Sequence, residues 1–289
     1  MSQTDRREFL SKVGRVGAVA GVGALMLPSG GCSDDAVATP DPLMQWPLQY
    51  APLTEARVRE LAYYTFYNGG CCYGAFEAIV AAMREEVGAP FDLIPTDMMR
   101  FGGGGVAGFG SLCGTLNGAA AAINLMFPNS EANPLISELL SWYAATPLPT
   151  SETNAYAMNS PTLPEGKTQL FAGDLGQSVS GGNLCHMSVT NWSRATGFGS
   201  GSAERKERCA RLTADIAVKA MQLMTAQFNG TFTAVQTLPR DNVNCSTCHK
   251  EGTDPDYGEF TNGKMDCGIC HVDPSEPLPS SSMGHPQPK

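Results

Sequence analysis

The chain has 289 residues, ten cysteines and a formal net charge of −9, with 42% hydrophobic and 16% charged residues. The acidic balance argues against nucleic acid or anionic lipid as partners, whereas it suits a basic redox partner. The length and apolar content are enough to bury a core, either as one domain or as a domain with an appendage.

Residues 1–31 are predicted to form a twin-arginine signal peptide. Arg6 and Arg7 precede a Phe-Leu pair and a weakly apolar run from Val16 to Leu27. This run is too short to span a bilayer, for which about 20 residues are needed. The predicted location is therefore the periplasm. Cys32, at the end of LPSGGC, leaves a lipid anchor as an alternative, although Ser29 stands where a lipobox normally has Leu.

Residues 32–52 are rich in Pro and Asp and are predicted to be a linker, and residues 53–238 are predicted to form a helical domain. Helical periodicity dominates this domain, and strand-like alternation is scarce. The candidate helices are residues 54–67, 72–87, 114–127, 134–145 and 203–228. Residues 148–183 are predicted to be rich in loops. The fold class is therefore mainly α, a helical cysteine-rich domain followed by an irregular C-terminal tail.

Five cysteines lie in the helical domain. Cys72 and Cys209 each lead an apolar helical stripe and Cys113 opens a helix, so these thiols are predicted to converge on a buried metal cluster. Cys71 lies one step off its stripe and is predicted to point elsewhere. Twin-arginine export carries folded proteins and so favours a cluster built in the cytoplasm. Disulfides, which would leave one of five thiols unpaired, and inert buried thiols remain alternatives.

The tail, residues 239–289, contains CxxCH twice. Two thiols at i and i+3 form thioether bonds to one haem, and the following His ligates its iron. The predicted haem c sites are Cys245, Cys248 and His249 for one haem and Cys267, Cys270 and His271 for the other. A four-cysteine zinc knuckle is the alternative, but it does not require a His after each pair. The tail has little apolar content, so the haems are predicted to be its filling.

Two of the four histidines in the chain remain for distal haem positions. His186 and His285 are the predicted distal ligands, and a methionine is the alternative. Full coordination leaves no open iron, which favours electron transfer over catalysis. A small multihaem reductase with a labile haem ligand or an exposed cluster iron is the alternative function. Cys185 and His186 are adjacent, and in extended backbone they would face opposite sides, one toward a cluster and one toward a haem.

The glycine run from Gly103 to Gly108 formally fits the dinucleotide pattern GxGxxG. No apolar strand precedes it, so a nucleotide site is not expected. Glycines shortly before Cys113 are instead predicted to let the backbone approach a metal cluster closely.

Three stretches carry a family resemblance, namely GGCCYGAFEAIVAAM, GGGGVAGFGSLCGTLNGAAAAINL and LCHMSVTNW, with Cys209 after them. They resemble the redox-active C-GCAxxG-C-C family. Their union with a C-terminal pair of CxxCH motifs resembles the split-Soret cytochrome c family, over roughly residues 50–289. By position, Cys72, Cys113, Cys185 and Cys209 match the family's cysteines, and Cys71 is an addition to that pattern.

The resemblance implies a helical domain with an iron–sulfur site and a dihaem tail that packs at one end of a homodimer. It also implies that distal haem ligands are contributed across the dimer, so at least one of His186 and His285 is predicted to act in trans. The expected function is electron transfer in the periplasm, with redox proteins as partners and with two haem c groups and an iron–sulfur cluster as cofactors.

Overall fold

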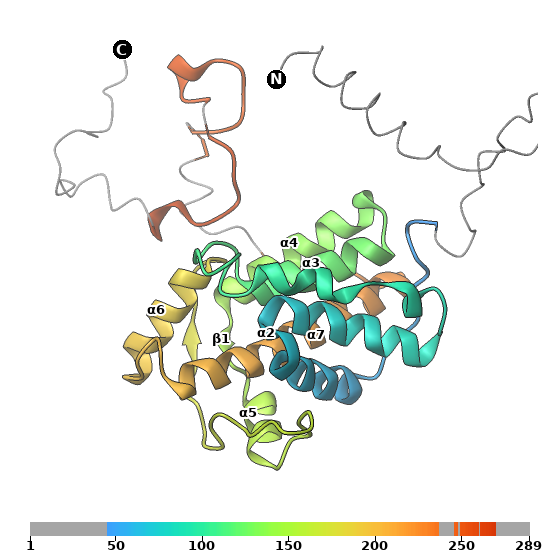
Figure 1. Ribbon diagram of the computed structural model, residues 1–289. Helices are drawn as coiled ribbons and strands as arrows, with labels where there is room; N and C mark the ends of the chain where they lie inside the picture. The colour runs from blue at the N-terminus through green and yellow to red at the C-terminus, as the bar shows by residue number, and fades with distance from the viewer. Residues whose placement is uncertain (1–44, 237–245, 248, 260, 270–289) are drawn as a thin grey trace, which may run out of the picture. The chain divides into compact units, whose positions relative to one another are not determined.

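The computed structural model describes residues 45–236, 246–247, 249–259 and 261–269. The predicted signal peptide and Cys32, Cys245, Cys248, Cys270, His271 and His285 lie outside the described residues. The α-helices are α2 (Glu55–Glu86), α3 (Gly114–Met126), α4 (Asn129–Ala145), α5 (Ser151–Met158), α6 (Cys185–Thr196) and α7 (Ala203–Phe228) (Figure 1). The mainly α fold is therefore confirmed, and the five segments with helical periodicity correspond to α2, α3, α4 or α7 to within one residue at the ends where a prediction extends beyond its helix.

Short elements connect these helices. Strands β1 (Pro147–Leu148) and β2 (Ser178–Val179) pair in antiparallel fashion. Single-turn or short 3-10 segments are η2 (Phe91–Leu93), η3 (Thr96–Gly102), η4 (Pro255–Tyr257) and η5 (Cys267–Ile269). Residues 148–183 are mostly irregular, but they also contain α5, which periodicity did not predict. Among the described residues, none of the helices combines the length and the apolar character that crossing a membrane requires.

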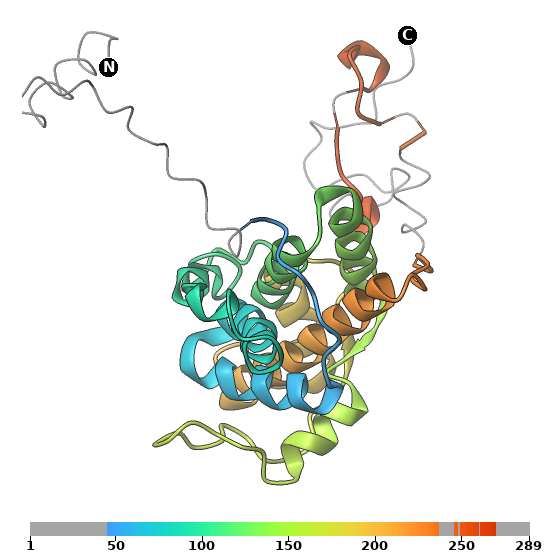
Figure 2. The same ribbon diagram turned by 90° about the vertical axis from the view of Figure 1, so that its right-hand side faces the viewer.

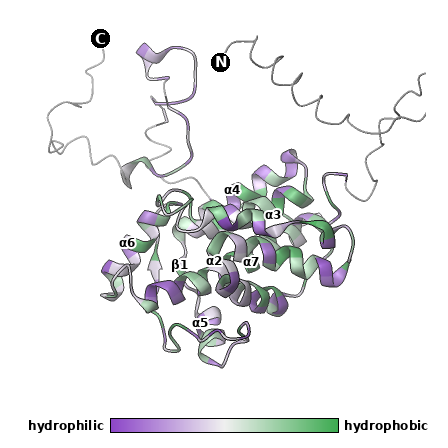
Figure 3. Cartoon of the chain, in the orientation of Figure 1, coloured by the Kyte–Doolittle hydropathy of each residue, from purple (hydrophilic) through white to green (hydrophobic). Residues whose placement is uncertain are grey.

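The core lies where α2, α3 and α7 meet. Helix α2 packs against both α3 and α7, α4 packs against α3 and α7, and α5 packs against α7. Phe76, Ile79, Leu116, Ile123 and Ile216 contribute large side chains that are almost completely buried. Figure 3 shows hydrophobic and hydrophilic residues together on the longer helices, which bury one face and expose another. Helix α7 packs against α2, α3, α4 and α5, and it buries polar as well as apolar side chains.

Helix α2 is divided by a kink at Gly70. Gly70 has φ 80° and ψ −172°, a conformation that glycine adopts at little cost and other residues avoid. The two segments predicted as separate helices, 54–67 and 72–87, are the two halves of α2. Because helical geometry restarts after Gly70, Cys71 stands at the N-terminus of the second half.

The segment before α2 packs on the helical domain (Figure 2). The Leu48 amide donates to the Leu125 carbonyl at 2.9 Å, and Trp46 Nε1 donates to the Asn124 carbonyl at 2.6 Å. Leu48 and Tyr50 are buried in the core. Apolar residues of the predicted linker therefore belong to the helical domain from about Trp46 onward.

The described part of the tail is held by hydrogen bonds rather than by a core. Between the two CxxCH motifs, the Lys250 amide donates to the Gly258 carbonyl, and the Glu259 carboxylate accepts from the amides of Thr253 and Asp254. None of the residues described among 246–259 and 261–268 is buried. That the haems supply the apolar interior of the tail stays a prediction.

Candidate metal centre

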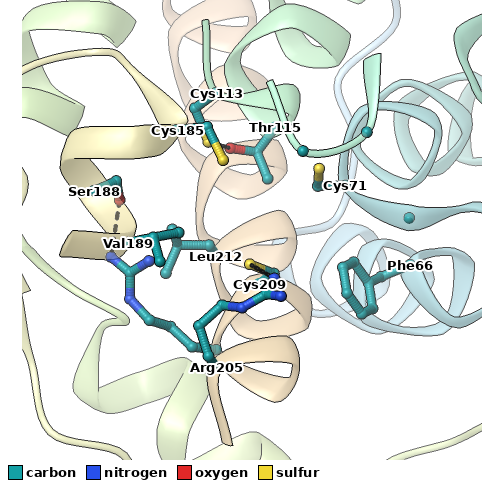
Figure 4. A pocket seen from close by; sticks show the side chains of 14 residues that line it. Phe66, Cys71, Cys113, Thr115, Cys185, Ser188, Val189, Arg205, Cys209 and Leu212 are labelled. Atoms are coloured by element: carbon teal, nitrogen blue, oxygen red, sulfur yellow. Dashed lines mark hydrogen bonds between the residues drawn. The ribbon is translucent and has the colours of Figure 1, made fainter. Parts of the chain in front are cut away.

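A cavity of about 200 Å³ lies among α2, α3, α6 and α7. Four thiols line it (Figure 4). Cys71 comes from α2, Cys113 from the N-cap position of α3, Cys185 from α6 and Cys209 from α7. These residues are up to 138 positions apart in the chain, so the fold brings them together. Three of the four predicted cluster ligands, Cys113, Cys185 and Cys209, are thus located at one cavity.

Cys72, the fourth predicted ligand, does not line this cavity. It is completely buried in the core and lies against Gly102, whereas Cys71 takes the cavity position. The expectation that Cys71 points elsewhere is wrong. The reason is the kink at Gly70, which ends the helical register of the first half of α2. The apolar stripe led by Cys72 is real, but it faces the protein core.

Three of the thiols stand at helix N-termini. Cys71 begins the second half of α2, Cys113 is the N-cap residue of α3, and Cys185 is the first residue of α6. A helix N-terminus carries partial positive charge and favours anions and thiolates. Cys209 differs, since it lies in the second turn of α7. The cavity is therefore placed where positive helix ends converge.

Glycines allow the backbone to pack closely against the thiols. A Cβ on Gly114 would overlap the Cys71 sulfur, and a Cβ on Gly105 would lie 2.8 Å from the Cys185 Cβ. Gly105 also has φ 73°. The glycine run follows the 3-10 segment η3, not the strand that precedes the glycines in the dinucleotide pattern. Its role in close backbone approach is supported by this packing.

Burial and mutual repulsion disfavour thiolates in this cavity. The pKa of Cys185 is raised to about 12, with burial as the largest cause; the charges of Cys113 and Cys209 also raise it, whereas Arg205 and Arg208 lower it. Burial, followed by the charges of the other three cavity thiols, also raises the pKa of Cys71 well above its usual range. At neutral pH Cys71 and Cys185 therefore stay protonated unless a cation takes up their charge, as a bound metal does.

Two arginines supply positive charge to the same cavity. Arg205 Nη1 lies 3.8 Å from the Cys209 sulfur, and Arg208 lines the wall while only 1% of its surface is exposed. The Arg208 Nε is buried and has no hydrogen-bond partner among the described residues. Thiol ligands, positive helix ends and a buried donor without an acceptor fit an anionic group such as an iron–sulfur cluster.

The described residues contain no compact site for a single metal ion. Within the described ranges, no three His, Cys, Asp or Glu side chains lie close enough together to hold a single ion. The five cysteines of the helical domain are free thiols, so none of them supports the disulfide alternative. Four thiols around a cavity of this size fit a cluster of several irons, in which different thiols bind different irons.

The predicted histidine ligands are only partly described. His186 is exposed in the first turn of α6, and its amide donates to the Gly110 carbonyl at 3.0 Å. Cys185 lines the cavity while His186 faces outward, which agrees with the expectation that the two side chains diverge. The predicted extended backbone is wrong, because α6 begins at Cys185. Of the haem residues in the two CxxCH motifs, His249 and Cys267 lie among the described residues.

Comparisons with known proteins agree with this architecture. The family described as "Putative redox-active protein (C_GCAxxG_C_C)" matches residues 73–223. The split-Soret cytochrome c of Desulfovibrio desulfuricans is 33% identical over 277 residues, which cover 92% of this chain and 94% of that relative. The chain belongs to the split-Soret cytochrome c family.

A solved structure shows the same relationship in three dimensions. It is described as showing a novel iron centre in the split-Soret cytochrome c from D. desulfuricans, and it aligns with a TM-score of 0.66 at 34% identity. The alignment covers 77% of this chain and 90% of the other. The match to the redox-active family includes Cys113, Cys185 and Cys209, and it begins after Cys71 and Cys72.

Among the cavity-wall residues that the sequence did not predict are Ser188, Arg205 and Arg208. Ser188 lies three residues after Cys185 and Arg205 lies four residues before Cys209, so helical spacing puts each on the side of its cysteine. That spacing was a usable signal. Arg208 is adjacent to Cys209 and has no such signal, since neighbouring helical residues do not share a face.

Proposed function

We propose that this protein is a periplasmic electron-transfer cytochrome that carries two haem c groups and one iron–sulfur cluster per chain. The observation that carries the proposal is a four-thiol cavity in the same chain as two CxxCH motifs. Membership of the split-Soret cytochrome c family supports haem, iron and electron transfer.

Cys71, Cys113, Cys185 and Cys209 would hold the cluster, which supplies one-electron storage. The chain contributes thiolates, positive helix ends and a largely buried site that limits contact with water. Cytoplasmic assembly of this cluster accounts for export of the folded domain by the twin-arginine route. The C-terminal tail then receives its haems after export, and a lipid anchor at Cys32 remains an alternative to cleavage of the signal.

In the tail, Cys245, Cys248 and His249 would bind one haem and Cys267, Cys270 and His271 the other, with His186 and His285 as distal ligands. Adjacent Cys185 and His186 then give a short covalent route between the cluster and a haem. A homodimer, with at least one of these distal histidines acting in trans, covers haem edges that a tail without a core leaves exposed. Sedimentation at micromolar concentration tests this, and a monomer with both haems six-coordinate contradicts it.

The cofactor content is tested by measuring haem and total iron together in protein purified from the periplasm. A pyridine haemochrome assay is expected to give two haems per chain, and total iron is expected to exceed that number. Cys113→Ala is expected to remove the excess iron and to leave the covalent haem. Iron equal to haem in the wild-type protein would contradict the cluster.

Binding of carbon monoxide separates electron transfer from catalysis at haem. A reduced protein with both haems six-coordinate is expected to bind no carbon monoxide, because no axial position is open. Stoichiometric binding would reveal an open haem iron and would favour the multihaem reductase over the electron-transfer protein.

A further inference from the structure

Arg208 is a buried cation for which the described residues provide no counter-charge. Its Nη2 donates to Ser188 Oγ at 3.0 Å, and its guanidinium carbon lies 5.5 Å from the centre of the Trp192 ring. No ion pair joins it to a carboxylate in the part of the chain that the structure describes. A buried charge is costly unless it is paired, so the charge of Arg208 requires a partner in its surroundings.

Arg211, one turn further along α7, shows how this fold otherwise treats a buried arginine. It is fully buried and pairs with the Glu207 carboxylate at 3.1 Å, and it also donates to Asn154 Oδ1 and to the Phe171 carbonyl, each at 2.9 Å. Each of the three guanidinium nitrogens of Arg211 donates a hydrogen bond to an oxygen atom. Arg208, in contrast, has no hydrogen-bond partner at Nε among the described residues, and it lines the wall of the four-thiol cavity.

Ser188 offers a second donor to the same cavity. Its Oγ accepts from the Tyr143 hydroxyl at 2.7 Å and from Arg208 at 3.0 Å. A hydroxyl oxygen has two acceptor positions, and both are taken, so the Ser188 proton is available to a third acceptor. Ser188 lines the cavity beside Cys185, and Figure 4 shows its bond to the guanidinium at the cavity wall.

We infer that Arg208, held in place by Ser188 and Trp192, is a positioning residue that sets the reduction potential of the iron–sulfur cluster. The inference rests on the cluster proposed above. Reduction adds one negative charge to the cluster. A fixed cation at the cavity wall stabilises the reduced form more than the oxidised form, and hydrogen bonds to cluster sulfur act in the same direction.

The test compares Arg208→Gln with Arg208→Lys and with Arg194→Gln in full-length protein carrying its cofactors. Gln removes the charge but keeps a donor that reaches toward Ser188, and Lys keeps the charge. Arg194 is exposed in the last turn of α6, so its substitution makes the same charge change away from the cavity. Non-haem iron per chain and the potential of the cluster, followed by paramagnetic resonance during a redox titration, are the two readouts.

With iron retained, Arg208→Gln is expected to lower the equilibrium constant for one-electron reduction at least tenfold, a shift of about 59 mV. Arg208→Lys is expected to retain most of the wild-type potential, and Arg194→Gln all of it. If Arg208→Gln loses non-haem iron, restoration of that iron by Arg208→Lys also supports the counter-charge. An unchanged potential in Arg208→Gln, or equal loss of iron in both variants, overturns the inference. Absence of non-haem iron in the wild-type protein would instead overturn the proposed cluster.

Discussion

Cys71 and Cys72 are neighbours in the chain, but their side chains lie in different environments. Cys71 lines the four-thiol cavity, and Cys72 is fully buried against Gly102 in the core. The kink at Gly70 produces this difference, because it sets where the second half of α2 begins.

Substitution of these two residues separates a ligand from a core residue. Cys71→Ala is expected to lower non-haem iron, because one of the four thiols at the cavity is lost. Cys72→Ala is the matched control and is expected to retain that iron, at a cost in stability of about 1 kcal/mol for the small core void. Iron analysis of both purified variants provides the measurement. A loss of iron confined to Cys72→Ala would place the ligand in the core instead.

Glu207 and Arg211 form a buried ion pair beside the cavity. The Glu207 carboxylate also accepts from the hydroxyls of Tyr63 and Tyr67, and both charged side chains are completely shielded from solvent. This network joins α2 to α7, the two helices that provide Cys71 and Cys209. The network matters for stability because removing one partner leaves the other charge buried and unpaired.

Glu207→Gln is therefore expected to lower the free energy of unfolding by about 3–5 kcal/mol. The measurement is denaturant unfolding followed by helical circular dichroism. Glu86→Gln, at the exposed end of α2, is the control and is expected to change stability by about 0.5 kcal/mol or less. Equal stability of the two variants would show that the buried pair contributes nothing that water does not replace.

At the scale of elements, α3 approaches α2 through glycine. A Cβ on Gly118 would overlap the Cys72 carbonyl, and one on Gly114 would overlap the Cys71 sulfur. Close packing of these helices sets the position of Cys113, the N-cap residue of α3, relative to Cys71. The glycines of α3 are thus part of the scaffold of the metal centre.

Gly118→Ala is expected to destabilise the protein, although replacing glycine by alanine usually stabilises a helix. In an open helix the change to Ala stabilises by up to about 1 kcal/mol, but the α2–α3 contact leaves no room for a methyl group. Overpacking is expected to lower the free energy of unfolding by about 1–3 kcal/mol. Gly201→Ala, where nothing lies within 4 Å, serves as the control in the same unfolding assay. A Gly118→Ala variant as stable as wild type would contradict the close contact.

Sequence patterns predicted the long helices but not the details that assemble the site. Apolar periodicity identified α2, α3, α4 and α7, because each buries one face continuously. Helix α6 was missed, since its sequence from Cys185 is largely polar and buries mainly Met187, Ser188 and Trp192. Three cavity thiols were predicted from their positions in helices or in the family pattern. Cys71 and Arg208 required the kink and the three-dimensional packing.

At the scale of the whole molecule, the proposed cluster site and the proposed haem sites lie in parts of the chain that are stabilised in different ways. The proposed cluster site lies in a helical domain with a continuous core, whereas none of the tail residues whose burial is described is buried. Under the proposed function, the domain with its own core would fold around the cluster before export, and the tail would receive its haems afterwards. This division agrees with export of a folded domain before the tail is completed.

Mössbauer spectroscopy of ⁵⁷Fe-enriched protein, in the wild type and in Cys113→Ala, tests the central claim most directly. The spectra distinguish haem iron from iron bound by sulfur. The account predicts both populations in the wild-type protein, and in Cys113→Ala it predicts loss of the sulfur-bound iron with the haem iron retained. Wild-type spectra that contain haem iron alone, or sulfur-bound iron that is unchanged by Cys113→Ala, would contradict it.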